Sequence, residues 1–252
     1  MKSLLKKTPL YIWYQAFSLA KWTEDDERRL IFYQQFIKPG SLVYDVGANV
    51  GNRTKLFLKL QANVIAFEPQ QKCANFLDAV FKKESNFKLV RKALGSKEGK
   101  GKMLIGDMSG LSTLSEEWLE AVEESKRFNS HSWNETQPCE ITTLDRAIEE
   151  FGIPSFIKID VENYEFEALS GLSSSIDCIS IEFHAETHEN TLKCIDYMES
   201  LLPKAVFQIS KDAIVFDLDN WVSAEEIKLI LSDLIFRERL AWGDLYIKCL
   251  SA

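Results

Sequence analysis

Short hydrophobic runs alternate with amphipathic stretches along most of this chain. The hydrophobic runs are typical of buried strands and occur at residues 42–46, 63–67, 87–90, 156–162, 176–183, 205–209 and 245–250. Between them, hydrophobic residues recur at intervals of three and four, which predicts helices at residues 53–60, 70–81, 115–127, 143–151, 163–172, 190–202 and 223–239. This alternation favours an α/β domain with a mostly parallel sheet of seven strands.

A less regular region separates the third and fourth of these strands. Lys and hydrophobic residues at 99–105 indicate a short strand or hairpin, and residues 139–142 indicate another short strand. Residues 128–138 are mostly polar and include a proline, so we expect a loop there. Because no linker rich in Pro, Gly or Ser interrupts the chain, we predict a single domain at residues 41–252.

Residues 1–40 precede this repeat and are predicted to form an N-terminal helical extension. Thr23 is suited to cap a helix because three acidic residues follow it, and Pro39-Gly40 ends the segment. The basic and aromatic stretch at 6–22 has two interpretations, a helix packed on the domain, which we favour, and a weak peripheral membrane contact. No run approaches the roughly 18 apolar residues of a transmembrane segment, and the absence of a cleavage-site pattern favours a cytoplasmic protein.

The turn after the first strand carries the clearest local signal. Gly47 permits a tight turn, Asn49 tolerates positive φ, and Gly51 allows the following helix to pack closely. Glu68 ends the second strand about 20 residues later, where an acidic side chain can bind both hydroxyls of a ribose. Strand, glycine turn, helix and acid together predict a nucleotide-binding βαβ unit.

The charge at this turn favours one cofactor over others. The full Gly-x-Gly-x-x-Gly pattern is absent, and Asp45 lies where its charge would repel a pyrophosphate. S-adenosylmethionine carries an ammonium group, a sulfonium and a ribose diol but no phosphate, so Asp45 and Glu68 suit it better than NAD. Two alternatives stay open: an NAD(P)-dependent oxidoreductase on a Rossmann fold, and a non-catalytic S-adenosylmethionine-binding protein.

Three motifs occur in a fixed order, VYDVGANVGN at 43–52, IAFEP at 65–69 and FIKIDVE at 156–162. Together they resemble the FkbM-type family of class I S-adenosylmethionine-dependent methyltransferases. The resemblance implies a Rossmann-like fold with an antiparallel last strand and helices on both faces of the sheet. It also implies O-methylation of a hydroxyl on a sugar, glycan or related natural product. The cofactor-binding residues it indicates are Asp45, Gly47, Asn49, Gly51, Asn52, Glu68, Pro69, Ala93, Leu94 and Asp160.

Transfer of a methyl group to a hydroxyl also requires the removal of a proton. Asp160, Glu162 and His184 lie at the ends of the fourth and fifth strands, next to the glycine turn. We predict Asp160 as the leading catalytic-site residue, His184 as the base and Glu162 as its orienting partner. The alternative interpretations are helix-capping acids and a loop histidine.

A metal ion is not favoured by the sequence, and no residue is assigned to one. Mg²⁺ or Mn²⁺ held by Asp160, Glu162 and His184 is the alternative. The family usually has Gly after Asp-Val-Glu, whereas this chain has Asn163. We expect Asn163 to keep the left-handed turn and to project its amide near the acceptor.

Composition limits the partners of the protein. The formal net charge of −8 argues against nucleic acid as the main partner, because nucleic-acid binding relies on clustered Lys and Arg. The five cysteines are odd in number and contain no Cys-x-x-Cys pair, which indicates free thiols in a reducing compartment. The expected partner is a small-molecule or glycan acceptor, and the sequence does not specify an oligomeric state.

Overall fold

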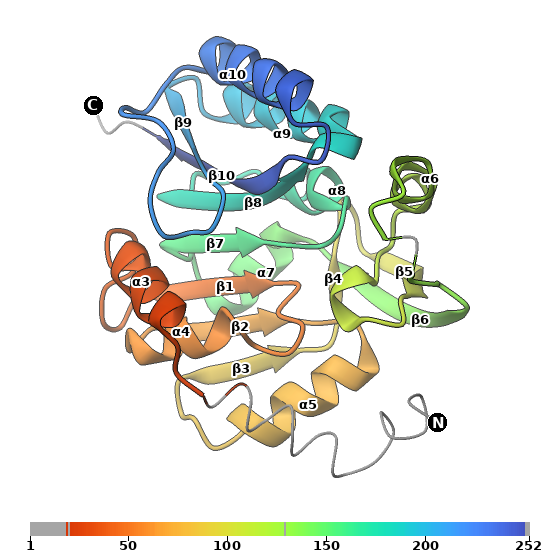
Figure 1. Cartoon of the computed structure of the whole chain (residues 1–252). Helices are drawn as coiled ribbons and strands as arrows, with labels where there is room; N and C mark the ends of the chain where they lie inside the picture. The colour runs from red at the N-terminus through yellow and green to blue at the C-terminus, as the bar shows by residue number, and fades with distance from the viewer. Residues whose placement is uncertain (1–18, 20, 129, 250–252) are drawn as a thin grey trace.

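The computed structural model describes residues 19, 21–128 and 130–249 (Figure 1). Its main sheet has seven strands in the order β3-β2-β1-β7-β8-β10-β9. These strands are β1 (Leu42–Val46), β2 (Asn63–Phe67), β3 (Phe87–Val90), β7 (Phe156–Ile159), β8 (Cys178–His184), β9 (Ala205–Ser210) and β10 (Trp242–Cys249). β10 is antiparallel to both of its neighbours, and the other pairs are parallel. The predicted α/β class, the seven strands and the antiparallel last strand are confirmed.

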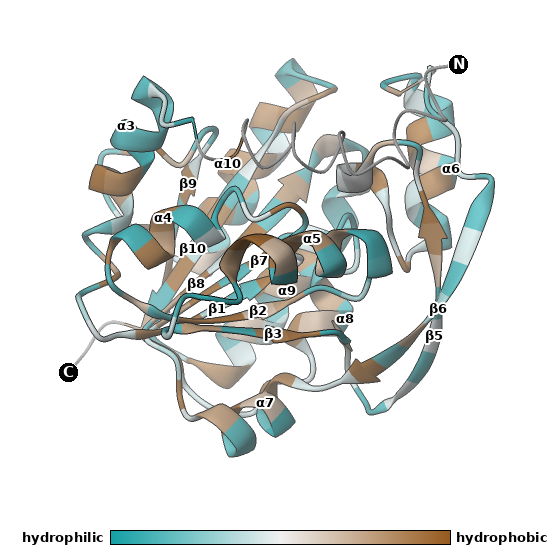
Figure 2. Ribbon diagram, turned by 90° about the horizontal axis from the view of Figure 1, so that it is seen from below, coloured by the Kyte–Doolittle hydropathy of each residue, from teal (hydrophilic) through white to brown (hydrophobic). Residues whose placement is uncertain are grey.

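Helices cover both faces of this sheet. They are α3 (Glu24–Tyr33), α4 (Thr54–Lys59), α5 (Gln71–Phe81), α6 (Glu116–Ser125), α7 (Leu144–Phe151), α8 (Glu165–Leu169), α9 (His188–Leu201) and α10 (Ala224–Arg237), with short 3₁₀ turns η1 (Ser109–Leu111) and η2 (Ala185–Thr187). Residues of α7, α8, α9 and α10 share one hydrophobic cluster with the strands. α3 and α4 form a second cluster, and α5 contributes to a third. Figure 2 shows the hydrophobic strands between α4 and α5 on one side and α7 on the other.

The hydrophobic sequence of each strand decides where it lies. β1, β7 and β8 are buried along nearly their whole length, as expected for central strands of a parallel sheet covered on both faces. Their carboxyl ends therefore meet at one edge between the helix layers, where open α/β sheets bind ligands.

A second, three-stranded sheet lies beside this edge. β6 (Glu135–Thr142) pairs with β4 (Ala93–Leu94) in parallel and with β5 (Gly99–Ile105) in antiparallel orientation. The expected loop at 128–138 is therefore wrong over its last four residues, which belong to β6. Pro138 is tolerated in this strand because β4 pairs only with Ile141 and Thr142, which leaves one edge of β6 open at the proline.

Helix α3 begins at the predicted N-cap. Thr23 and Asp26 form a capping box, in which each side chain bonds the backbone N–H of the other residue. Lys55 of α4 binds the Asp26 carboxylate at 2.8 Å, and this ion pair joins the two helices. The predictions for residues 1–18 concern positions outside the described residues, so the N-terminal extension at 1–40 and its boundary stay a prediction. Within the described part of the chain, every helix is too short or too polar to cross a bilayer.

Candidate active site

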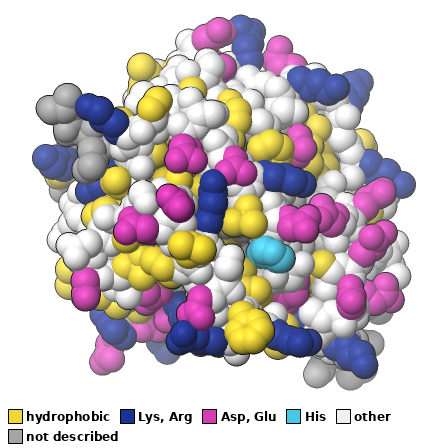
Figure 3. Space-filling view, turned by 90° about the horizontal axis from the view of Figure 1, so that it is seen from above, with side chains coloured by type: hydrophobic (Ala, Val, Ile, Leu, Met, Phe, Trp, Pro, Cys, Tyr) yellow, Lys and Arg dark blue, Asp and Glu magenta, His cyan; other side chains and the backbone are white. Residues whose placement is uncertain are grey.

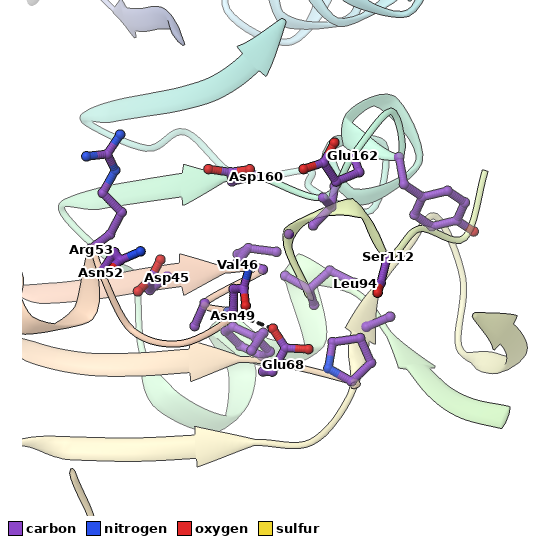
Figure 4. A pocket seen from close by; sticks show the side chains of 18 of the residues that line it. Asp45, Val46, Asn49, Asn52, Arg53, Glu68, Leu94, Ser112, Asp160 and Glu162 are labelled. Carbon is purple, nitrogen blue, oxygen red and sulfur yellow. Dashed lines mark hydrogen bonds between the residues drawn. The ribbon is translucent and has the colours of Figure 1, made fainter. Parts of the chain in front are cut away.

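A cavity of about 480 Å³ opens at the carboxyl edge of the main sheet (Figure 4). Its walls come from the turn after β1, the end of β2, β4, the start of α3 and the segment after β7. Of the ten predicted cofactor-binding residues, only Gly51 does not line this cavity. Sequence motifs separated by more than 100 residues thus meet in one place.

Gly47 is required by two independent features of the turn. Its φ is +80°, a left-handed conformation that side chains disfavour. A Cβ added to Gly47 would lie 1.8 Å from the carbonyl oxygen of Asp160. The turn after β1 can therefore approach the segment after β7 this closely only because residue 47 has no side chain.

Gly51 has a supporting role outside the cavity. Its φ is +87°, and a Cβ there would lie 2.6 Å from the Phe81 ring and 3.0 Å from Leu77. Gly51 therefore lets α5 pack against the turn, whereas the close approach predicted for this position was that of the directly following helix, α4.

Glu68 is buried at the end of β2 and bonds the backbone of two turns. One carboxylate oxygen accepts the N–H of Asn49 and the other accepts the N–H of Gln70, each at 2.7 Å. Asn49 has the predicted positive φ, at 50°. Burial raises the pKa of Glu68 to about 7 despite these two bonds. Each carboxylate oxygen can accept a second hydrogen bond, so Glu68 retains capacity for a diol.

Asp45 lies on the other side of the turn and is almost fully buried. Its carboxylate accepts a 2.5 Å hydrogen bond from the Thr54 hydroxyl. Burial raises the pKa of Asp45 to about 6, because only Thr54 and more distant cations favour its charged form. A cationic ligand group beside Asp45 would stabilise the carboxylate.

The opposite wall of the cavity is acidic. Asp160 and Glu162 both line it, from the segment directly after β7 (Figure 4). Burial and the neighbouring Glu182 raise the pKa of Asp160 to about 6, although Lys158 lies 3.4 Å away. Burial, followed by the charges of Glu182 and Asp160, also raises the pKa of Glu162. Asp160 can therefore accept and release a proton near neutral pH.

His184 does not line the cavity. Its ring packs against Trp118, with the ring centroids 4.7 Å apart. Nε2 of His184 lies 3.1 Å from Glu182 and 4.0 Å from Glu162, and Nδ1 faces the Arg127 guanidinium at 3.4 Å. The histidine therefore reaches the cavity indirectly, through Glu162 and through Glu182, which interacts with Asp160.

Sequence reasoning missed Glu182, which joins the predicted acids to His184. Burial acts to raise its pKa, but His184 and Lys158 lower the pKa of Glu182 to about 2. The sequence did contain a signal for Glu182, because residues two apart on a strand point to the same face of the sheet. Glu182 and His184 are such a pair on β8.

Asn163 behaves in part as predicted. Glu162 and Asn163 have φ values of 54° and 66°, so the left-handed turn is kept and α8 begins only at Glu165. Asn163 does not line the cavity, in contrast to the expectation that its amide projects near the acceptor. It is buried, and its Nδ2 donates to the Ser115 hydroxyl at the start of α6.

The charge at the α3 end of the cavity differs from that near β7. Lys21, Arg29, Arg53 and Lys55 line this end. The Arg53 guanidinium interacts electrostatically with Asp244 and with Asp160 of the acidic wall. The face of the molecule drawn in Figure 3 shows Lys and Arg interspersed with Asp and Glu, without a continuous basic surface among its described residues.

Comparisons with known proteins identify the family. The family model "Methyltransferase FkbM domain" matches residues 45–209, and no curated protein matches the chain. Among solved structures, an rRNA methylase from Streptococcus thermophilus is 12% identical, with 92% of this chain and 100% of that chain covered and a TM-score of 0.46. A precorrin-6y C5,15-methyltransferase from Geobacter metallireducens is 10% identical, with 90% of each chain covered and a TM-score of 0.46.

The family match and the cavity coincide. The matched residues cover more than half of the chain and run from Asp45 at the glycine turn to Ile209 on β9. They include the whole carboxyl edge of the parallel strands that the cavity uses. This chain belongs to the FkbM methyltransferase domain family.

Proposed function

We propose that this protein transfers the methyl group of S-adenosylmethionine to a hydroxyl of a sugar, glycan or related small molecule. The observation that carries the proposal is the pair of buried carboxylates, Asp45 and Glu68, on either side of the glycine turn in one cavity. We expect Glu68 to accept hydrogen bonds from a ribose diol. Asp45 offers negative charge to the cationic methionine portion of the donor.

The acidic wall supports a role in proton removal. As the new O–C bond forms and the C–S bond breaks, the acceptor hydroxyl loses its proton to the carboxylate of Asp160. S-adenosylhomocysteine leaves as a neutral thioether. A base whose pKa of about 6 lies near working pH can take that proton and release it to solvent. We assign Asp160 as this base, Glu162 as its neighbour on the acceptor side, and His184 an indirect role through Glu162.

Most of the transfer rate would come from placement. In-line displacement at a methyl group requires donor and acceptor to be held in contact and in line. The cavity has one end built from the glycine turn and another built from α3 and α4. We propose that the glycine-turn end binds the donor and that the acceptor binds along the wall formed by Asp160 and Glu162.

The first test is a thermal-shift titration with S-adenosylhomocysteine, NAD and ATP. A ligand at 100 times its Kd adds about 2.7 kcal/mol to the stability of the native state, a shift of several degrees at this size. We expect a rise with S-adenosylhomocysteine alone, lost in Glu68→Ala and kept in the control Glu84→Ala, an exposed acid on the loop after α5. A larger rise with NAD would favour the oxidoreductase alternative and overturn the proposal.

The second test separates an enzyme from a binding protein. Transfer of labelled methyl groups from the donor to sugars, glycans and other hydroxyl acceptors is expected to fall at least 100-fold in Asp160→Asn. Donor binding in the same variant is expected to persist. Donor binding by the wild type without methylation of any acceptor class would support the non-catalytic alternative.

A further inference from the structure

Three side chains of metal-ligating type converge beside the acidic wall. Glu182 and His184 come from β8, and Glu162 follows β7, the adjacent strand. One oxygen of each glutamate and one nitrogen of His184 all lie within 4.8 Å of one another. Nε2 of His184 is 3.1 Å from Oε2 of Glu182 and 4.0 Å from Oε2 of Glu162.

Two of these converging atoms lack a hydrogen-bond partner among the described residues. They are Nε2 of His184 and Oε2 of Glu182, which are close to each other but poorly aligned for a hydrogen bond. The His184 side chain is only 9% exposed. Buried polar atoms almost always have a partner, so atoms that point at a common centre in this way are suited to a ligand between them.

The surroundings carry excess negative charge. Glu162 and Glu182 lie with Asp160 and Glu165 in one group whose charges act on one another, and of the four only Glu165 is fully buried. The two nearest cationic side chains are already paired with other carboxylates. Lys158 binds Asp244 at 2.9 Å, and Arg127 binds Glu186 at 2.9 Å. A bound cation would relieve repulsion that otherwise has to be met by protons.

We propose that Glu162, Glu182 and His184 bind a divalent transition-metal ion of the Mn²⁺ or Zn²⁺ type. A set of one imidazole and two carboxylates suits these ions better than Ca²⁺ or Mg²⁺, which prefer oxygen ligands alone. Metal–ligand bonds of about 2.0–2.2 Å hold ligand atoms at most roughly 4.4 Å apart. The present set therefore needs to contract by a few tenths of an ångström around the ion.

The role of this ion rests on the proposed methyl transfer. Glu162 belongs both to the ligand set and to the cavity wall, so the ion would lie at the acceptor end. If the acceptor hydroxyl completes the coordination of the ion, the ion would act as a Lewis acid and lower the pKa of that hydroxyl. The proton passes to Asp160, and the ion is neither oxidised nor consumed.

Arg127 is the competitor for the same histidine. Its guanidinium lies 3.4 Å from Nδ1 of His184 and also donates to Glu186. A neutral imidazole that binds a metal through Nε2 carries its proton on Nδ1 and cannot accept from Arg127. Metal binding therefore requires Arg127 to give up its contact with His184 and to keep its bonds to Glu186. We expect Arg127→Gln to increase the affinity for the metal several-fold.

The test is Mn²⁺ uptake by the full chain, followed by the loss of the free-ion electron paramagnetic resonance signal. We expect one ion per chain at micromolar concentration. His184→Gln and Glu182→Gln, checked for folding by circular dichroism, are each expected to weaken uptake at least tenfold. His188→Gln, four residues from His184 and outside the cluster, is the matched control and is expected to match the wild type.

Two results would overturn the site. The folded wild type could take up neither Mn²⁺ nor Zn²⁺ at millimolar concentration, or both variants could bind as the wild type does. If neither variant folds, Glu162→Gln replaces them under the same criterion. S-adenosylhomocysteine binding is measured in parallel without metal, so that loss of the metal site and loss of the donor site are read separately.

Discussion

At the scale of single residues, two glycines with nearly the same backbone separate conformational strain from steric exclusion. Gly40 and Gly47 have φ values of +82° and +80°. A Cβ on Gly40 would have no atom within 4 Å. A Cβ on Gly47 would lie 1.8 Å from the carbonyl oxygen of Asp160. Any difference between Ala substitutions at the two sites therefore measures the close approach of the turn to the segment after β7.

We predict that Gly40→Ala lowers the free energy of unfolding by about 1–2 kcal/mol, the cost of the left-handed conformation. Gly47→Ala is expected to cost at least 3 kcal/mol, because the backbone of Asp160 has to move as well. Urea unfolding measures both values. S-adenosylhomocysteine binding should be lost only in Gly47→Ala. Equal costs at the two sites, or retained binding in Gly47→Ala, would contradict this account of the turn.

Local patterns in the sequence predicted the cavity better than the buried acid cluster. Gly47, Asn49 and Glu68 lie within one βαβ unit, so spacing along the chain fixes their relation in space. The contact of Glu182 with Asp160 depends instead on which strands become neighbours and in which register. A sequence pattern names the strand ends but not these pairings, and for that reason His184 was expected in the cavity and lies behind Glu162.

At the scale of elements, the main sheet was predictable because its strands are continuous hydrophobic runs. β5 and β6 are not such runs, since Gly99–Ile105 contains two lysines and β6 contains Pro138. Their pairing rests on backbone hydrogen bonds along a register of seven residue pairs. Side-chain periodicity carries little information about strands that pair mainly through backbone hydrogen bonds. The sequence therefore predicted only parts of the second sheet, at residues 99–105 and 139–142.

The ion pair between α3 and α4 decides how the N-terminal helix meets the cavity. The side chains of Asp26 and Lys55 are 9% and 13% exposed, and both residues line the cavity. Burial acts to raise the pKa of Asp26, but hydrogen bonds from Lys55 and Thr23 hold it below its ordinary value. The charged pair is therefore a structural link between the two helices.

We predict that Lys55→Ala lowers the free energy of unfolding by roughly 2 kcal/mol, because Asp26 then loses its cation in a buried setting. The control is Asp25→Ala, which removes an exposed ion pair with Arg28 on the same helix and is expected to change stability by less than about 0.5 kcal/mol. Chemical denaturation gives both numbers. If the two variants lose equal stability, the link between α3 and α4 is not what holds the helix in place.

At the scale of the whole molecule, polar side chains run across one face of the sheet away from the cavity. Paired residues on neighbouring strands point to the same face. The row that continues from Asp160 contains Glu182, Asp244 and Ser210, which are paired in succession across β8, β10 and β9. The fold thus places several buried ionisable groups in one layer, and its stability is expected to depend on pH.

The sign of that dependence follows from the direction of the pKa shifts. Burial raises the pKa values of Asp45 and Asp160 to about 6 and those of Glu68 and Glu165 to about 7. Between about pH 4.5 and 7, the native state therefore holds more protons than the unfolded chain. Stability falls as pH rises through this window. The lowered pKa of Glu182, about 2, adds stability that is lost only below about pH 4.5.

We predict that the melting temperature of the ligand-free protein falls by several degrees between pH 5 and pH 8. Glu165→Gln should flatten this fall and raise stability at pH 8. The replacement removes a buried charge beside Glu182, and an amide oxygen can still accept the Val161 N–H. The gain has an upper limit of roughly 3 kcal/mol.

The exposed Glu84→Gln is the control for this experiment and should follow the wild-type curve. The raised pKa of His184 acts in the same direction, since a histidine that is more basic in the native state loses its contribution as pH rises. Glu165→Gln therefore flattens the curve without abolishing it. A melting temperature that rises from pH 5 to pH 8 would mean that the acid cluster is charged and compensated in the free protein. Such compensation by a cation that remains bound through purification would be removed by a chelator, and the predicted fall should then reappear.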